Sequence, residues 1–383
     1  MVKKIESVGW DSGFDFEKIV ISEQERVRFA ATTFKPGPIN QFAGLENRKN
    51  FKQSQMIVEF EGENYYIGRK AIDNDPQGGI RTFETRRFEK PETIVRFLAG
   101  ILLFSGGQSV EVENLVLGLN IEDYKKYRED IVNVYKDTPF TIKIPKNDEM
   151  IKVSIGIKNC ECIAQGFGAY YNEILDYDSN MKQEDMTDVW NGVIDIGGRT
   201  CDILIAQGNE PKPRTATSFS MGTASAYKEV RRQIGGSINY LLIEEKHLKK
   251  KNKAKLGDRQ HNINNLCQSA FENLASRITN RVISEWDDYL HRVDSVILTG
   301  GGAEYVYDYF DENFPAEVRV NDDCQFGNAA GYHKIGKVYA SKGKGKGKSQ
   351  PNKNGKQLKK KKKPENQNQP HNKNKNKKHQ NNN

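Results

Sequence analysis

The sequence has little of what marks a secreted, membrane-spanning or metal-binding protein. Its five cysteines are scattered and odd in number, which excludes a disulfide framework. No apolar run approaches the ~20 residues that a membrane helix needs, and the opening stretch MVKKIESVGWDSG has no apolar signal-peptide core. We therefore expect a cytoplasmic protein whose cysteines are small buried apolar residues.

Two common nucleotide-binding motifs are also missing. The sequence has no Gly-x-x-x-x-Gly-Lys-Ser/Thr loop and no Gly-x-Gly-x-x-Gly loop, so the P-loop and Rossmann signatures are excluded. The chain has 383 residues. Because single domains usually contain ~100–200 residues, this length allows two or more domains with their own cores.

The charge is unevenly distributed along the chain. The formal net charge is +8, but residues 341–383 hold 15 Lys and one Glu, a net of +14, so residues 1–340 carry −6. The C-terminal stretch consists of Lys, Asn, Gly and Gln with almost nothing apolar, and it cannot bury enough surface to offset the entropy of ordering. We expect a mildly acidic folded body followed by a disordered basic tail.

Hydrophobic patterning predicts a mixed α/β body. The opening residues alternate as three strands of a meander, and a hairpin QMIVEFEGENYYIG lies within the loop-rich stretch 36–83. Residues 91–104 predict a helix that begins at Pro91, and residues 122–135 predict a second helix by the spacing of their apolar side chains.

The second half repeats the theme of the first. Residues 189–206 read as strand, glycine turn and strand, like residues 7–21, which points to two homologous halves. Residues 220–291 predict two long helices separated by a Lys-rich connection at 246–255. Residues 325–337 (QFGNAAGYHKIGK) predict a closing helix.

Three glycine turns carry the chemistry. In the first, residues 11–18 (DSGFDFEK), Gly13 allows backbone amides to approach phosphate oxygens, Lys18 can reach the same oxygens, and Asp11 can hold a hydrated magnesium ion. In the second, residues 195–202 (DIGGRTCD), two glycines expose amides, the Thr200 hydroxyl adds a donor, and Asp195 takes the place of Asp11. The third, TGGGAE at 299–304, lies between a strand and a helix, where bare backbone can accept a base or ribose.

The order of these turns resembles the actin, DnaK-chaperone and sugar-kinase superfamily. Within it, the chain is similar to the bacterial actin-like plasmid-segregation ATPases, the ParM group, in VGWDSGFDFEK, IAQGFGAYY, VIDIGGRTCDI, VILTGGGAEYV and CQFGNAAGY. The resemblance covers about residues 5–340 and implies two related α/β domains around a central nucleotide cleft. The implied boundaries are 1–189 for the first domain, with a small subdomain at about 36–83; 190–322 for the second, with a helical subdomain at about 218–290; 323–340 for the closing helix; and 341–383 for the tail.

The resemblance also assigns site residues. A Gln or Glu before the second turn orients the attacking water, and the matches are Gln165 and, as second choice, Glu161. The expected ligands are ATP or ADP, with GTP left open, and Mg²⁺ held largely through water by Asp11 and Asp195. The phosphate contacts are Ser12, Gly13, Phe14, Lys18, Gly197, Gly198, Arg199 and Thr200, and the adenosine contacts are Gly222, Lys228, Glu229, Gly300, Gly301, Gly302 and Glu304. Phe14 stands where many members of the superfamily have a small hydroxyl residue, and Asp15 adds negative charge beside the phosphates.

The implied function is an ATPase that polymerises into nucleotide-dependent filaments for plasmid segregation. Its partners would be other copies of itself and a small adaptor protein bound to centromere-like plasmid DNA, without a membrane. Two alternatives remain open: a non-filament actin-like scaffold and a small-molecule kinase with the same clamp. The basic tail can neutralise phosphates without reading bases, bridge acidic filament bodies, or simply solubilise the chain.

Overall fold

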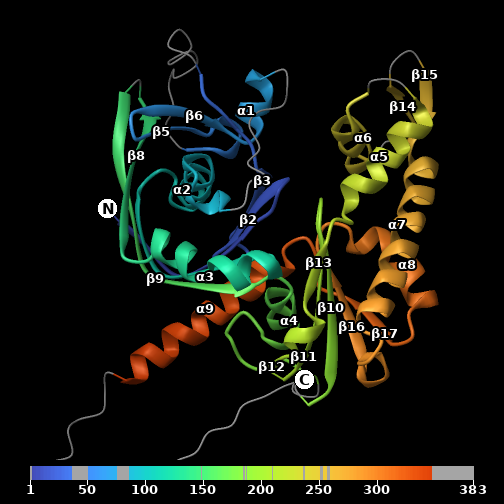
Figure 1. Cartoon of the computed structure of the whole chain (residues 1–383). Coiled ribbons are helices and arrows are strands. Elements are labelled where there is room, and N and C mark those ends of the chain that lie inside the picture. The colour runs from blue at the N-terminus through green and yellow to red at the C-terminus, as the bar shows by residue number, and fades with distance from the viewer. Residues whose placement is uncertain are drawn as a thin grey trace, which may run out of the picture.

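The computed structural model describes residues 2–36, 51–75, 86–147, 149–183, 186, 188–208, 210–235, 238–250, 253–256 and 259–346. These residues form two large mixed sheets flanked by helices and one separate two-stranded hairpin (Figure 1). The predicted α/β class is therefore confirmed. Within the described ranges, no helix has both the length and the apolar character to cross a membrane.

The first sheet has nine strands in the order β3-β2-β1-β7-β9-β8-β5-β6-β4. In this sheet the pairs β1–β7 and β7–β9 are parallel, and all the other neighbouring pairs are antiparallel. The strands are β1 Val2–Ser12, β2 Phe16–Val20, β3 Arg26–Ala30, β4 Thr33–Phe34, β5 Ile57–Phe60, β6 Glu63–Ile67, β7 Ser109–Leu119, β8 Thr138–Lys146 and β9 Glu149–Ala164.

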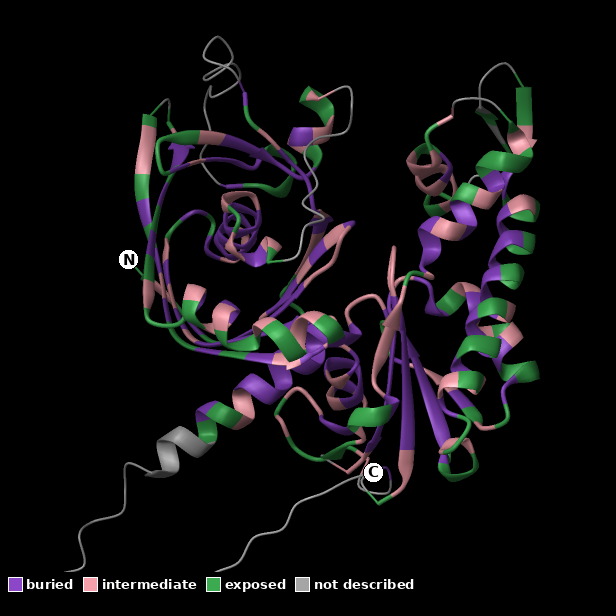
Figure 2. Cartoon of the chain, in the orientation of Figure 1, coloured by how far each residue is buried: buried purple, intermediate pink, exposed green. Residues whose placement is uncertain are grey.

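The first sheet curls around helix α2, Pro91–Ser105 (Figure 1). This helix begins at Pro91, as predicted, and nearly all of its residues are buried (Figure 2). A helix that is apolar on every side must be covered on every side, and the curled sheet provides that cover. The cluster around α2 is the core of the first domain.

The second sheet repeats the central order of the first. Its strands follow the order β12-β11-β10-β16-β17, and β13 pairs with β11. In both sheets an antiparallel hairpin, β1–β2 or β10–β11, is extended by two parallel strands, which confirms the duplication predicted from the sequence. The strands are β10 Trp190–Ile196, β11 Cys201–Gln207, β12 Glu210–Pro211, β13 Thr217–Phe219, β16 Ser295–Thr299 and β17 Glu317–Val320.

The helical part of the second domain differs from the prediction of two long helices. It contains α5 Thr223–Ile234, α6 Tyr240–Leu248, the hairpin β14 Lys253–Leu256 and β15 Arg259–Asn262, and α7 Ile263–Glu285. Gly235, at φ +79°, ends α5, and the side chains of Asn239 and Asn262 accept hydrogen bonds from the first amides of α6 and α7. A C-terminal glycine and asparagine N-caps divide a run that looks continuous by its hydrophobic spacing.

The remaining helices lie on the two sheets. They are α1 Arg69–Asn74, α3 Ile121–Tyr135, α4 Phe167–Ile174, α8 Ala303–Asn313 and α9 Gly327–Lys346. Short 3₁₀ helices are η2 Gln53–Gln55, η3 Arg87–Glu89, η5 Pro213–Thr215 and η6 Leu290–Arg292.

Helix α9 returns the chain from the second sheet to the first domain, as predicted, and packs there through glycines. A Cβ at Gly9 of β1 would lie 1.9 Å from the carbonyl oxygen of Ala329, and one at Gly331 would lie 1.7 Å from that of Gly168 in α4. The helix backbone therefore touches its neighbours directly. It also continues to Lys346, past the expected start of the tail at Ser341, and residues 347–383 of the predicted disordered tail lie outside the described residues.

Candidate nucleotide-binding cleft

A cleft opens between the two domains and is lined by residues of both. All three glycine turns contribute to its wall. The predicted site residues that line it are Asp11, Ser12, Gly13, Phe14, Lys18, Gln165, Asp195, Gly197, Gly198, Thr200 and Gly301.

The first turn connects β1 to β2. The amide of Gly13 donates to the carbonyl of Phe16 at 3.0 Å, and the buried Asp11 carboxylate forms an ion pair with Lys18 at 2.8 Å. Burial opposes the charge of Lys18, but Asp11 outweighs it, and the pKa of Lys18 is raised. The Lys18 ammonium is therefore charged and lies at the cleft wall.

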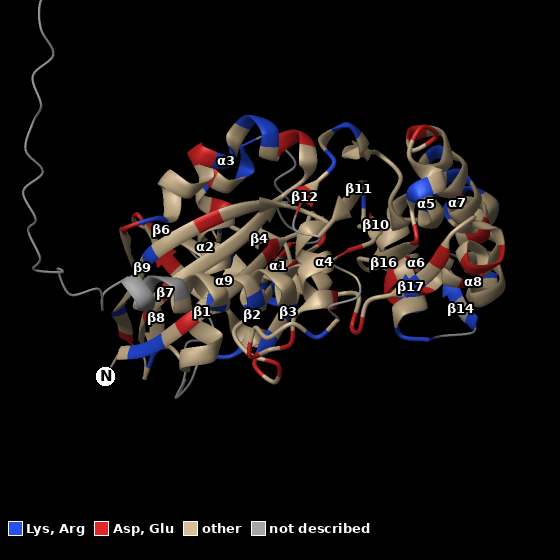
Figure 3. Ribbon diagram, turned by 90° about the horizontal axis from the view of Figure 1, so that it is seen from below, with Lys and Arg blue, Asp and Glu red and all other residues tan. Residues whose placement is uncertain are grey.

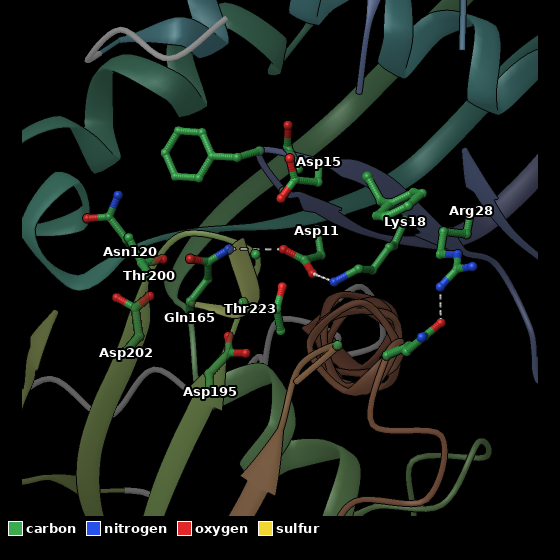
Figure 4. A pocket seen from close by; sticks show the side chains of 18 of the residues that line it. Asp11, Asp15, Lys18, Arg28, Asn120, Gln165, Asp195, Thr200, Asp202 and Thr223 are labelled. Carbon is green, nitrogen blue, oxygen red and sulfur yellow. Dashed lines mark hydrogen bonds and ion pairs between the residues drawn. The ribbon is translucent and has the colours of Figure 1, made fainter. Parts of the chain in front are cut away.

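Gln165 reaches Asp11 from the end of another strand of the same sheet. It follows the end of β9, and its side-chain Nε2 donates to Asp11 Oδ1 at 3.0 Å. Figure 4 shows Asp11 and Asp15 entering the cleft from the first turn, Asp195, Thr200 and Asp202 from the second, and Gln165 between them.

The second turn has the same geometry as the first. The amide of Gly197 donates to the carbonyl of Thr200 at 2.9 Å, three residues on, as in the first turn. The carbonyls of Gly197 and Gly198 accept from the first two amides of α5 at 3.0 and 2.8 Å. The helix approaches this closely because residue 222 has no side chain: a Cβ on Gly222 would lie 2.4 Å from the Arg199 nitrogen.

The third turn packs mainly against the second. Gly300 has φ +84°, and a Cβ there would lie 2.4 Å from Asp195 Oδ1. The amide of Gly302 donates to the carbonyl of Ile196 at 2.9 Å. Of the three glycines in this turn that were predicted to meet adenosine, only Gly301 lines the cleft, since Gly300 and Gly302 support the second turn.

Negative charge is concentrated on the floor of the cleft. Burial and then the charge of Asp11 raise the pKa of Asp195 to about 6, although Asn328 donates to it at 2.6 Å. Burial and then Asp195 raise the pKa of Asp202 to about 7. Carboxylates held together in this way favour a cation between them.

The donor set fits Mg²⁺ bound mainly through water. In the described part of the chain, no group of three Asp, Glu, His or Cys side chains is placed to hold a metal ion by itself. Mg²⁺ commonly keeps several waters and binds one or two carboxylates together with phosphate oxygens. Asp11 and Asp195, which face each other across the cleft, suit that mode.

Several predicted site residues do not line the cleft. Glu161 is exposed on β9, whereas Gln165 lies beyond the strand, so the spacing of four does not bring them to one side. Lys228 lies over the Tyr240 ring at 5.6 Å, and Glu229 accepts from Asn273 at 2.8 Å, both within the helical part of the domain. Glu304 is exposed on α8.

Arg199 and Gly222 do not line the cleft either. Arg199 is half-buried in the second turn, and Gly222 packs against the back of that turn rather than against a ligand. Arg199 is thus part of the second turn, and Gly222 lies against that turn at the start of α5.

Other cleft residues were not assigned as contacts from the sequence, although Asp15 was expected to lie beside the phosphates. They are Asp15, Phe16, Arg28, Arg87, Asn120, Asp202, Thr223, Tyr227, Glu244, Leu248, Tyr305 and Gln325. Asp202 lies within the quoted second turn, and Asn120 directly follows a buried strand as the N-cap of α3, so both had a local signal. Asp15 lies against the second turn, because a Cβ on Gly198 would be 1.9 Å from its Oδ2.

Two duplicated α/β halves, joined by α9 and separated by a cleft between matching hairpin turns, define a protein of the actin-like fold class. Two families match the chain in succession. The family described as actin-like proteins N-terminal domain matches residues 9–168. The family described as archaeal actin homologue MreB-like, C-terminal, matches residues 193–312.

Known proteins agree with this class. An archaeal actin homologue from Thermoplasma volcanium is 31% identical over 147 residues, which cover 37% of this chain and only 44% of that relative. The actin-like protein Alp7A superposes with a TM-score of 0.75 at 13% identity and covers 91% of this chain and 99% of its own.

Of two further similar solved structures, one contains a bound ligand and the other is an assembly of many subunits. An archaeal actin homologue in complex with ADP has a TM-score of 0.68 at 20% identity and covers 88% of this chain and 100% of its own. A 15-stranded ParM filament from Clostridium botulinum has a TM-score of 0.64 at 20% identity, with coverage of 88% and 100%. The chain therefore has the actin-like fold, as predicted from its sequence, and its narrower assignment to the ParM group stays a prediction.

Proposed function

We propose that this chain is an ATPase that assembles into filaments under the control of bound nucleotide. The observation that carries the proposal is the pair of hairpin turns, which present the same backbone geometry and two aspartates to one cleft. The ADP complex of one structural neighbour and the filament formed by another support it.

The phosphates are expected to lie between the first and second turns. The backbone amides of both turns, the Lys18 ammonium and the Thr200 hydroxyl supply donors around them. Bound Mg²⁺ would neutralise phosphate oxygens, with Asp11 and Asp195 holding its water ligands. GTP in place of ATP remains open for this site.

Gln165 is the residue proposed to position the attacking water. Its Nε2 is held by Asp11 at 3.0 Å, which fixes the carboxamide and leaves its oxygen to accept a hydrogen bond from water. A carboxamide is a poor base, so hydrolysis should be slow. Slow hydrolysis suits an enzyme in which the rate of hydrolysis sets the lifetime of a filament. Glu161 is exposed on β9 and serves as the matched control.

The proposed partners follow from the filament role. They are further copies of this chain and a small adaptor protein that joins the filament to centromere-like plasmid DNA. In Figure 3 both basic and acidic residues occur along α3, α7 and α8. The 15 lysines of residues 341–383 are the stretch proposed to bind nucleic acid or bundle filaments.

Sedimentation and negative-stain microscopy test the proposal together. The purified chain should pellet and show filaments with Mg²⁺-ATP or a non-hydrolysable analogue, and it should pellet less with ADP. Gln165→Ala should prolong filament lifetime while Glu161→Ala behaves as wild type. Absence of pelleting with ATP over a wide range of protein concentrations contradicts the filament role, and absence of nucleotide binding contradicts the ATPase role.

A further inference from the structure

The two phosphate turns are held from behind by different groups. Behind the second turn, the N-terminus of α5 supplies two backbone amides to the carbonyls of Gly197 and Gly198. Behind the first turn, the side chain of Arg87 takes that part: its guanidinium donates to the carbonyl of Gly13 at 3.1 Å and also to that of Ser12. One arginine therefore does for the first turn what a helix N-terminus does for the second.

These carbonyl contacts decide where the amides point. In a trans peptide the C=O and the following N–H point in opposite directions. Holding the Gly13 carbonyl toward Arg87 therefore turns the N–H of Phe14 the other way, and holding the carbonyls of Gly197 and Gly198 toward α5 does the same for the next two amides of the second turn. In both turns the donors are directed away from their support, as a phosphate site requires.

Phe14 completes the arrangement from the front. Its ring lies 4.4 Å from the Arg87 guanidinium carbon, a cation–π contact, and both residues line the cleft. Burial lowers the pKa of Arg87, with Glu17 opposing and Arg96 adding to the effect, yet an arginine remains charged at neutral pH. An aromatic ring at position 14 thus cannot donate to a phosphate, but it can hold the guanidinium in place.

The preceding residue aims Arg87 inward. Arg86 has a left-handed backbone at φ +61°, which is uncommon for a residue other than glycine. Its side chain is tied outward to Glu89 at 3.0 Å and to Asp130 at 3.4 Å. With Arg86 held on the surface, Arg87 in η3 faces the turn.

We propose that Arg87 is the positioning residue of the first phosphate turn, and that the Phe14 ring holds the Arg87 guanidinium in place. The inference rests on the proposed nucleotide binding. It identifies the recognised group as the polyphosphate of a nucleoside triphosphate, because the turn that Arg87 holds faces the phosphate part of the cleft rather than the base.

Substitutions at position 87 test this. Arg87→Ala removes both donors and should weaken Mg²⁺-ATP binding at least ~10-fold, which corresponds to about 1.4 kcal/mol. Arg87→Lys should fall between Ala and wild type, because an ammonium lacks the planar fork that reaches two carbonyls. Arg128→Ala, on the exposed face of α3, is the matched control and should bind ATP as wild type.

Chemical rescue separates positioning from general folding. Millimolar guanidinium ion should restore much of the ATP affinity of Arg87→Ala, whereas ammonium at equal ionic strength should not. Thermal unfolding of the nucleotide-free variant shows whether the fold survives; if Arg87→Ala is unfolded, the binding ratio of Arg87→Lys to wild type decides instead.

The outcomes are distinct. If wild type binds ATP and the folded Arg87 variants bind it within about twofold, the inference is wrong while the proposed function stands. If ammonium rescues as well as guanidinium, the planar fork is not what matters and the inference is also wrong. If wild type itself binds no nucleoside triphosphate, the proposed function fails, and the inference fails with it.

Discussion

Replacing Gly222 by alanine tests whether α5 holds the second phosphate turn in place. The added Cβ would lie 2.4 Å from the Arg199 nitrogen and 2.5 Å from the Gly198 carbonyl carbon. Both are backbone atoms of the turn, so no side-chain rotation relieves the contact. The only relief is to move the start of α5 away from the turn.

That movement has two costs. Overpacking of a close contact costs ~1–3 kcal/mol. The two hydrogen bonds from α5 to the carbonyls of Gly197 and Gly198, now 3.0 and 2.8 Å, would lengthen, and each contributes about 1 kcal/mol. We expect Gly222→Ala to lower the free energy of unfolding by about 2 kcal/mol and to weaken Mg²⁺-ATP binding about 10-fold, since 1.4 kcal/mol corresponds to that factor.

Urea unfolding and calorimetric titration with Mg²⁺-ATP measure the two effects. Gly156→Ala is the matched control, because it lies on β9 with ordinary φ and a Cβ there meets no atom within 4 Å. It should leave both quantities close to wild type. A Gly222→Ala chain with wild-type stability and wild-type affinity would refute the reasoning, since the turn would then not depend on its contact with α5.

Three further variants follow from the same structure. Gln165→Ala should slow steady-state ATP hydrolysis ~100-fold, at the lower end of the range for lost proton-transfer or water positioning, and leave ATP affinity nearly unchanged; equal losses in Glu161→Ala would contradict the assignment. Arg96→Met should destabilise the first domain by ~3–5 kcal/mol in urea unfolding, because the buried Glu17 carboxylate loses its partner at 2.6 Å; a double variant with Glu17→Gln should recover part of that loss. Burial lowers the pKa of His333 to about 4 from 6.5, so its neutral form is favoured in the folded state: stability is full above pH 6.5 and falls as the pH drops toward 4, by about 2 kcal/mol between pH 7.5 and 5. His333→Gln should flatten that part of the pH–stability curve, and an unchanged slope would show that another group is responsible.

Much of the fold could be predicted because local signals and global structure agree. Pro91 begins α2, the Glu61–Gly62 turn joins β5 to β6 with positive φ at both residues, and the repeated hairpins form the centres of both sheets. These features depend on neighbours in sequence. Strand β8 and helix α4 were not assigned. Strand β8 contains two prolines, Pro139 and Pro145, which usually argue against a strand, and α4 has only eight residues, too few for a clear helical period.

The turns of the candidate site could be predicted from the sequence, but the residues that hold those turns in place could not. Residue type and spacing alone identify four residues that line the cleft: Asp11, Gly13, Asp195 and Thr200. Arg87 lies more than 70 residues from the turn it contacts, and nothing in its local sequence marks it. Glu161 shows the converse. Its even spacing from Gln165 suggested the same side of the strand, but Glu161 is exposed on β9, whereas Gln165 lies past the end of β9, next to the turn into α4 at Gly166 with φ +89°.

Helix α9 has a mechanical consequence. At Gly9 and Gly331 its backbone contacts β1 and α4 directly, and these close contacts hold it against the first domain. Near its start, Asn328 bonds to Asp195 in the cleft floor at 2.6 Å, and its 20 residues extend ~30 Å at 1.5 Å each. A shift of the second domain would thus act on α9 at its Asn328 end, and the opposite end of α9 leads into the lysine-rich tail. If the chain forms a filament, the distance between subunits would set the distance between the C-terminal ends of successive α9 helices. The positive charge of the lysine-rich tails would then recur at regular intervals along the filament.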